Sequence, residues 1–105
     1  MTDTVVPGPV GSVHQVLAAL QDPMRLEMVR RLHNAGTAVQ CSALYDGINK
    51  STATHHFKIL REAGLTERFA ADGLTYQRLR TADVDAALPG LLEAVVGSAN
   101  RQAGQ

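Results

Sequence analysis

The sequence lacks tryptophan, has a single cysteine, Cys41, and contains no long apolar run. With one cysteine no disulfide can form within the chain, which is typical of proteins in a reducing cytoplasm. No stretch approaches the roughly 18 apolar residues of a membrane-spanning helix, and the N-terminus has no basic region followed by an apolar segment. We therefore expect a cytoplasmic protein that neither spans a membrane nor is exported.

The sequence also lacks the residue patterns of an enzyme. Its 105 residues suffice for one domain with a small core, and because only 4% of them are aromatic this core is expected to be aliphatic. There is no glycine-rich phosphate loop, no nucleophile at a recognisable spacing from a base, and no room for a large pocket. We expect no catalytic activity.

The net charge is zero, but the charges are distributed unevenly. Residues 49–80 contain six basic and three acidic residues, whereas the last 25 residues contain three acidic residues and one arginine. Local charge, rather than the total, sets the field that a phosphate backbone meets. Residues 49–80 are therefore the candidate region for binding nucleic acid.

Apolar periodicity and capping residues predict two helices in the first third of the chain. Apolar residues at i, i+3, i+4 and i+7 predict a helix at residues 13–20. A second helix is predicted at residues 23–35, because Asp22 can cap its start, Pro23 suits its first position and Gly36 can end it. The residues before the first helix are rich in proline and glycine, without periodicity.

The rest of the chain predicts a helix-turn-helix, a β-hairpin and a last helix. In order, we expect a short helix at 41–45, a turn at Asp46-Gly47, a helix at 50–63 capped by Asn49 and ended by Gly64, a hairpin around Asp72-Gly73, and a helix with an apolar stripe from Leu88 to Ala99. The predicted fold class is mainly α with a small β-hairpin, in the order α-α-α-α-β-β-α. The expected divisions are a disordered arm (1–11), a folded domain (12–98) and a flexible tail (99–105).

The segment KSTATHHFKILREAGL, residues 50–65, predicts a helix with one polar face. At 100° per residue, the side opposite the apolar residues carries Lys50, Ser51, Thr54, His55 and Lys58. Such a face offers hydrogen-bond donors, hydroxyl groups and ammonium groups. It suits the major groove of DNA, where the second helix of a helix-turn-helix reads base edges.

These segments resemble winged-helix transcriptional regulators of the ArsR/SmtB type over roughly residues 13–96. The resemblance is carried by ALQDPMRLEMVRRL, KSTATHHFKILREAGL and ADGLTYQRLR, with Thr54 and Phe57 where the family usually has Ser and Leu. It implies a DNA-binding homodimer, expected to be a repressor, on an inverted-repeat operator. The first and last helices would pack together in the dimer, and the aliphatic stripe of the last helix agrees with that role.

The resemblance and the residue pattern together assign residues to two surfaces. For DNA contact by the recognition helix we expect Lys50, Ser51, Thr52, Thr54, His55 and Lys58. For DNA contact by the wing and its flank we expect Arg61, Arg68, Arg78 and Arg80. For the dimer interface we expect Val13, Val16, Leu17, Leu88, Leu91, Leu92, Val95 and Val96.

No cofactor is expected. His55 and His56 project about 100° apart on a helix, so they cannot easily chelate one ion; His55 would face DNA and His56 the scaffold. Cys41 stands alone where many family members have Cys-x-Cys, and no histidine follows His56 to complete the family's site on the last helix. Three alternatives stay open: a nonstandard Ni²⁺ or Zn²⁺ site using His14, His33 or Cys41 with carboxylates, a sensory partner protein, and a winged helix that binds protein instead of DNA.

Overall fold

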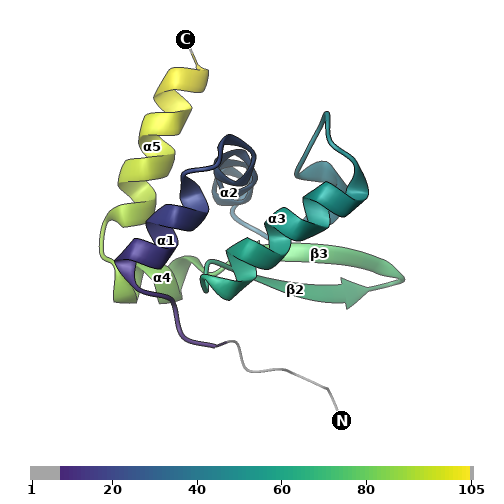
Figure 1. Cartoon of the computed structure of the whole chain (residues 1–105), viewed down its shortest axis with the longest axis horizontal. Helices are drawn as coiled ribbons and strands as arrows, with labels where there is room; N and C mark the ends of the chain where they lie inside the picture. Colours follow the sequence, from purple (N-terminus) through teal and green to yellow (C-terminus); the bar gives the residue numbers. More distant parts are fainter. Residues whose placement is uncertain (1–7, 105) are drawn as a thin grey trace.

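The computed structural model describes residues 8–104, which form helices around a small sheet (Figure 1). In chain order the elements are α1 (Val13–Leu20), α2 (Pro23–Ala35), β1 (Val39–Gln40), the 3-10 turn η1 (Cys41–Ala43), α3 (Lys50–Glu62), β2 (Thr66–Ala71), β3 (Leu74–Leu79), α4 (Thr81–Ala87) and α5 (Leu91–Ala103). The predicted class, mainly helical with a small antiparallel sheet, is confirmed.

The predicted helix boundaries are confirmed where capping residues marked them. The Asp22 carboxylate accepts hydrogen bonds from the backbone N–H groups of Met24 and Arg25 at 2.9 and 3.0 Å, and Asn49 accepts from Thr52 at 2.8 Å. Gly36 ends α2 in the left-handed conformation, with φ of 68°. Side-chain acceptors at a helix start satisfy N–H groups that have no partner inside the helix, so these residues fix where α2 and α3 begin.

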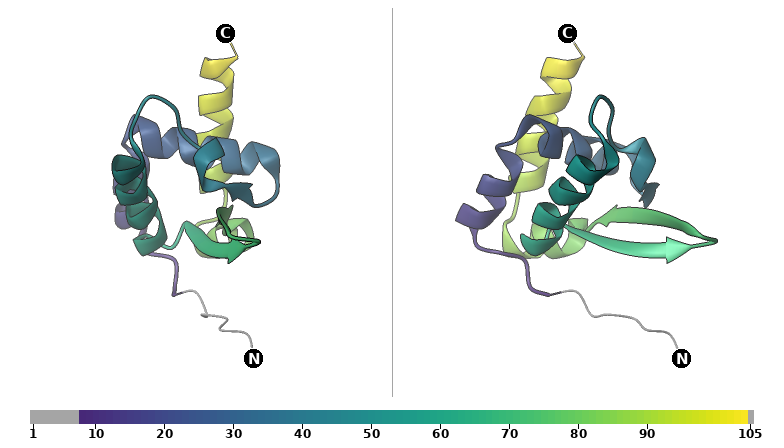
Figure 2. Two further views of the ribbon diagram at one scale, coloured as in Figure 1. Left: turned by 90° about the vertical axis from the view of Figure 1, so that its right-hand side faces the viewer. Right: turned by 45° about the vertical axis from the view of Figure 1, so that its right-hand side comes forward.

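The hairpin forms as predicted, and a third strand joins it. Asp72 and Gly73 have φ of 52° and 77°, as a two-residue turn between right-twisted strands requires. Strands β2 and β3 pair antiparallel, and the short β1 pairs with the other edge of β3, with Val39 opposite Gln77. Two residues are too few to show alternation, so β1 gave no signal in the sequence. The hairpin projects from the helical body in Figure 2.

The C-terminal third differs from the prediction. The expected stripe from Leu88 to Ala99 is not one helix: Leu88 lies between α4 and α5, and α5 begins only at Leu91, after Gly90 with φ of 82°. Helix α4 has seven residues, too short for a clear periodic pattern. Helix α5 continues to Ala103, so residues 99–103 are helical rather than a flexible tail. The short helix predicted at residues 41–45 also differs, because the structure has only the 3-10 turn η1 there.

The N-terminal arm is only partly within the described residues. Residues 1–7 of the predicted arm lie outside them. Residues 8–11 belong to no helix or strand, but Val10 packs against the core and the Gly11 N–H donates to the carbonyl of Ala63 at 2.9 Å. The last two residues of the predicted arm are therefore bound to the folded domain.

The core lies between the helices and one face of the sheet. Helix α2 packs against α1, α3, α5 and β3, which places it at the centre of the domain (Figure 1). The largest fully buried apolar side chains are Val16, Met28, Val29, Leu32, Leu44, Leu60, Leu65, Val84, Leu92 and Val96. Among the described residues, no helix has both the length and the apolar character needed to span a membrane.

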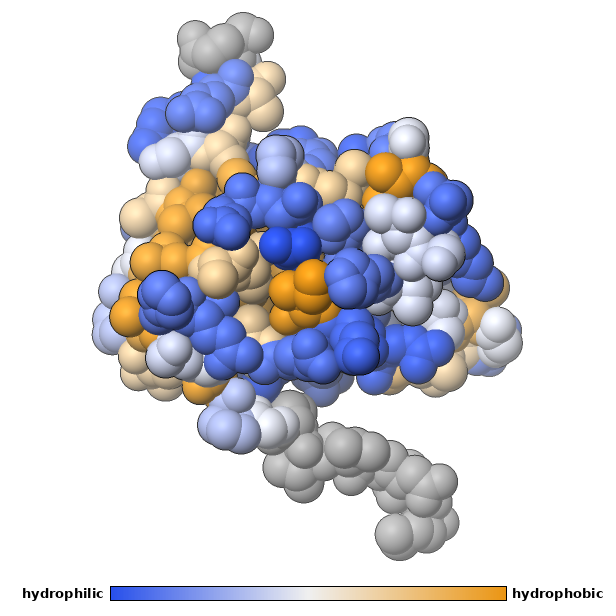
Figure 3. Space-filling model, viewed as in Figure 1, coloured by the Kyte–Doolittle hydropathy of each residue, from blue (hydrophilic) through white to orange (hydrophobic). Residues whose placement is uncertain are grey.

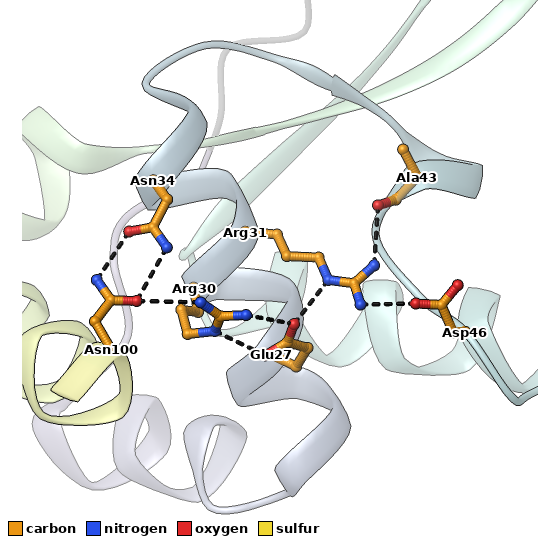
Figure 4. A network of polar contacts seen from close by, with 7 residues as sticks. All are labelled: Glu27, Arg30, Arg31, Asn34, Ala43, Asp46 and Asn100. Atoms are coloured by element: carbon orange, nitrogen blue, oxygen red, sulfur yellow. Dashed lines mark hydrogen bonds and ion pairs between the residues drawn. The ribbon is translucent and has the colours of Figure 1, made fainter. Parts of the chain in front are cut away.

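A polar network joins the outer side of α2 to its neighbours (Figure 4). Glu27 accepts hydrogen bonds from Arg30 at 2.8 and 2.9 Å and from Arg31 at 2.8 Å. Arg31 also reaches the loop after η1 through Asp46, at 2.7 Å, and Arg30 reaches Asn100 of α5 at 3.3 Å. Two arginines that had no assigned role in the sequence thus connect α2 to the helix-turn-helix loop and to α5.

The network predicts an acid-sensitive contribution to stability. Hydrogen bonds from Arg30, outweighing partial burial, and then those from Arg31, lower the pKa of Glu27 from 4.5 to about 2. A lowered folded-state pKa stabilises the fold above pH 4.5, and this contribution is lost as the pH falls toward 2. Because the side chain is 30% exposed, we expect only about 1–2 kcal/mol after solvent screening.

Urea unfolding at pH 7 and pH 3 measures this effect. Between pH 7 and pH 3, the free energy of unfolding of the natural chain should fall by about 1–2 kcal/mol more than that of a Glu27→Gln variant, because glutamine cannot take up the proton. An equal loss in both proteins would assign the acid sensitivity to other groups.

Candidate DNA-binding surface

Helix α3 presents the predicted polar face to solvent. Lys50, Ser51, Thr52, Thr54, His55 and Lys58 are all exposed, whereas Ala53, Phe57 and Leu60 on the opposite side are buried in the core. The periodicity of the sequence therefore placed both faces of α3 correctly.

The exposed groups on α3 retain most of their hydrogen-bonding capacity. The Thr54 hydroxyl donates to the carbonyl of Lys50 at 2.8 Å, which uses its hydrogen but leaves its oxygen as an acceptor. Lys58 lies 4.0 Å from Glu62, and both side chains are about 60% exposed, so this ion pair is weak. The lysine can exchange Glu62 for a phosphate at little cost.

The two adjacent histidines have different surroundings. His55 is exposed, whereas the His56 side chain is only 14% exposed and its Nδ1 lies 3.1 Å from Nη1 of Arg25. Because a guanidinium can only donate, Nδ1 must accept, and the ring proton is assigned to Nε2. Arg25 also donates to the carbonyl of Ala19 at 2.7 Å. His56 thus faces the scaffold, where Arg25 links α3 to the end of α1.

A groove of about 620 Å³ separates α3 from the sheet. Its charged lining residues are Lys50 and Arg61 from α3 and Arg68 from β2, and no acidic residue of the described chain lines it. Its floor includes Gln77, whose side-chain nitrogen lies 3.8 Å from the sulfur of Cys41. Three cations without an acid make this groove the most favourable place on this side of the molecule for a phosphate group.

The arginines of the hairpin differ in availability. Arg68 is exposed and has no ionic partner among residues 8–104. Arg78 is also exposed, but its Nε donates to Glu67 at 3.1 Å and its guanidinium lies 5.2 Å from the centre of the Phe69 ring. Arg68 therefore offers a phosphate an uncompensated charge, and Arg78 a partly neutralised one.

Known proteins with related sequences and structures fit this arrangement. The helix-turn-helix domain family matches residues 20–68. An uncharacterized HTH-type transcriptional regulator of Bacillus subtilis strain 168, YceK, is 40% identical over 81 residues, covering 75% of this chain and 81% of that protein. The crystal structure of the transcriptional repressor BigR from Xylella fastidiosa has a TM-score of 0.62 and 26% identity, covering 79% of this chain and 81% of that chain.

An ArsR-like transcriptional regulator from Rhodococcus sp. RHA1 shares the fold, with a TM-score of 0.61 and 22% identity over 87% of this chain and 86% of that chain. The chain belongs to the HTH-type transcriptional regulators, and its fold is that of the ArsR-like regulator. Such proteins are regulators and not enzymes, in agreement with the sequence. Helix α3 is the second helix of the matched helix-turn-helix, and the hairpin of β2 and β3 corresponds to the predicted wing.

Arg80 does not belong to the DNA-facing surface of this regulator. The residue is only 9% exposed; Nη1 donates to the carbonyl of Gly64 at 3.2 Å, and Nε and Nη2 donate to Asp83 at 3.2 and 3.1 Å. Its assignment to the wing contacts is therefore corrected. It follows the last residue of β3, where the chain turns inward, and it ties the wing to the C-terminal end of α3.

The predicted dimer interface divides into exposed and buried residues. Val16, Leu92 and Val96 are at most 1% exposed within one chain, so they are core residues and the prediction that they contact a second chain is corrected. Val13 and Leu17 on α1 are about half exposed. Leu88, Leu91 and Val95 are partly buried against the core. Apolar atoms gather over α1 and α5 in Figure 3, on the side away from the wing.

The three low-priority metal candidates lie on different elements. His14 is on α1, His33 near the end of α2 and Cys41 on η1. Within residues 8–104 there is no group of three histidine, cysteine, aspartate or glutamate residues placed to hold one ion.

Proposed function

We propose that this regulator binds an inverted-repeat DNA operator as a homodimer and represses transcription. The observation that carries the proposal is the exposed polar face of α3 beside the acid-free cationic groove. The face can lie in the major groove while the groove between α3 and the wing receives the adjoining phosphates. Repression is supported by the likeness to BigR, a transcriptional repressor.

The homodimer is supported by the apolar surface on α1 and α5. Val13 and Leu17 lie on the side of α1 that the rest of the chain leaves open, and Leu91 and Val95 of α5 are only partly buried. A two-fold axis through this surface would present two recognition helices. Half-sites would then be about 10–11 base pairs apart, or a multiple of that distance, from centre to centre.

The proposal predicts different roles for two neighbouring residues of α3. His55→Ala should reduce specific operator binding by about 1–3 kcal/mol, because an imidazole that reads a base edge carries sequence information. Lys58→Ala should weaken binding to all sequences similarly and reduce the salt slope by about one unit, because an ammonium group on a phosphate releases counterions.

Fluorescence anisotropy on operator and scrambled DNA, titrated with salt, distinguishes these roles. The operator is taken from the promoter region of the protein's own gene. Absence of tighter binding to any such fragment than to scrambled DNA would contradict the proposed function. Equal losses on both DNAs for His55→Ala would remove His55 from base recognition.

A further inference from the structure

The C-terminal end of the recognition helix has an unusually complete set of hydrogen bonds. The last carbonyls of a helix have no partner within it, and they are commonly satisfied by a left-handed glycine just beyond its end. Here the N–H of Gly64 donates to Arg61 and the N–H of Leu65 donates to Leu60, at 2.9 and 3.0 Å. This motif leaves the carbonyls of Glu62 and Ala63 without a local donor.

Gly11, just before α1, and Gln15, in the first turn of α1, supply both missing donors. The backbone N–H of Gly11 donates to the carbonyl of Ala63 at 2.9 Å. The side-chain amide of Gln15 donates to the carbonyl of Glu62 at 3.1 Å. Residues 47 or more positions away in the sequence thus complete the end of α3.

The contact between this segment and Gly64 leaves no room for a side chain. Gly64 has φ of 80°, and a Cβ added to it would lie 2.6 Å from Cα of Val10 and 2.7 Å from the carbonyl oxygen of Pro9. Both of these are backbone atoms, so a Cβ could be accommodated only if the segment moved away. Gly64 is therefore required by the close approach as well as by its backbone conformation.

We infer that Pro9–Gln15 positions the recognition helix, with Gly11, Gln15 and Gly64 as its positioning residues. This inference rests on the proposed function, because it concerns how α3 is presented to DNA. At its middle, α3 is held by the contact of His56 with Arg25; at its C-terminal end it is held by this segment and by Arg80. A helix that is held at both places presents its polar face to the base edges in one fixed orientation.

The same segment continues directly into the proposed dimer surface. Gln15 lies between Val13 and Leu17 in sequence, and its side chain contacts α3 while theirs are exposed on another side of α1. A shift of α1 at the dimer contact would therefore move the donors for Glu62 and Ala63. The orientation of each recognition helix is coupled in this way to the pairing of the two chains.

A matched pair of substitutions tests the inference. Gly64→Asn adds a Cβ where the segment lies, whereas Gly36→Asn adds one at a second left-handed glycine, φ 68°, with nothing within 4 Å. Asparagine tolerates the left-handed conformation, so backbone strain is small and similar in the two variants. Gln15→Ala removes one donor without adding volume, and Gln102→Ala on the exposed end of α5 is its control.

Binding is measured at a temperature where circular dichroism shows every variant folded. We expect Gly64→Asn to lower the ratio of operator affinity to scrambled-DNA affinity at least fivefold, and Gln15→Ala to lower it about threefold. Both control variants should keep the ratio of the natural chain. Equal ratios in Gly64→Asn and Gly36→Asn, together with an unchanged ratio in Gln15→Ala, would overturn the inference. If Gly64→Asn does not fold, Gln15→Ala against its control decides alone.

Amide hydrogen exchange separates this result from a failure of the proposed function, because it needs no DNA. The Gly11 amide and the last turn of α3 should exchange at least fivefold faster in Gly64→Asn than in Gly36→Asn. Unchanged exchange would show that the segment does not hold α3, whatever the protein binds. Faster exchange in a chain without operator specificity would refute the DNA-binding proposal while retaining the contact.

Discussion

Leu17→Asp is expected to yield a folded monomer whose operator affinity is at least a hundredfold lower. Leu17 is 48% exposed on α1, so aspartate is solvated in the free chain and the fold tolerates it. In the proposed dimer the carboxylate would be buried in an apolar contact without a partner, which costs several kcal/mol. Loss of the second chain removes one of two linked half-site contacts, and with it the gain from their effective concentration.

Sedimentation equilibrium and operator binding measure the two parts of this prediction. Ala18→Asp places the same charge on another exposed side of α1 and should remain dimeric. Val96→Asp should instead prevent folding, because Val96 is fully buried within one chain. A Leu17→Asp protein that sediments as a dimer would exclude this face of α1 from the interface.

The contrast between Leu17 and Val96 shows what apolar periodicity can and cannot predict. The stripe on the last helix is real, but α5 uses one part of it, Leu92 and Val96, against the core. Leu91 and Val95 are one position earlier and remain partly accessible. The residues that face the core and those that stay accessible are equally hydrophobic. The sequence therefore shows how wide the apolar surface is, but not whether the core or a second chain covers a given part of it.

Most of the fold followed from local signals. Asp22, Asn49 and the glycines after α2 and α3 marked helix ends through interactions with their own backbone neighbourhood, and the structure confirms them. Asp72-Gly73 marked the hairpin for the same reason. Elements β1 and α4 were missed, because a two-residue strand and a seven-residue helix are too short to establish a period.

The candidate site was predictable in part. Features that arise within one segment could be predicted, whereas contacts between residues far apart in the sequence could not. The exposed face of α3 came from 3.6-residue periodicity within one segment. The contact of Arg25 with His56 spans 31 residues and that of Gln15 with Glu62 spans 47, and no spacing rule connects such positions. The prediction that Arg80 contacts DNA was wrong for a related reason. Its proximity in sequence to Arg78 suggested a shared role, but the chain turns inward after β3 and Arg80 is buried.

Arg80→Ala is expected to reduce stability by about 2–3 kcal/mol while sparing the salt dependence of DNA binding. The substitution removes the donor from the buried Gly64 carbonyl and leaves it unsatisfied at the end of α3. For a domain of this size such a loss lowers the melting temperature by about 10–20 °C. The exposed Asp83, at 60% side-chain exposure, keeps its hydration and adds little to the loss.

Arg68→Ala should show the opposite pattern, because Arg68 is exposed and lines the cationic groove. Its melting temperature should stay within a few degrees of the natural chain, while affinity for every DNA sequence falls and the salt slope drops by about one unit. Thermal melts by circular dichroism and anisotropy titrations in salt compare the two variants. An Arg80→Ala protein with an unchanged melt but a reduced salt slope would return Arg80 to the DNA-binding surface.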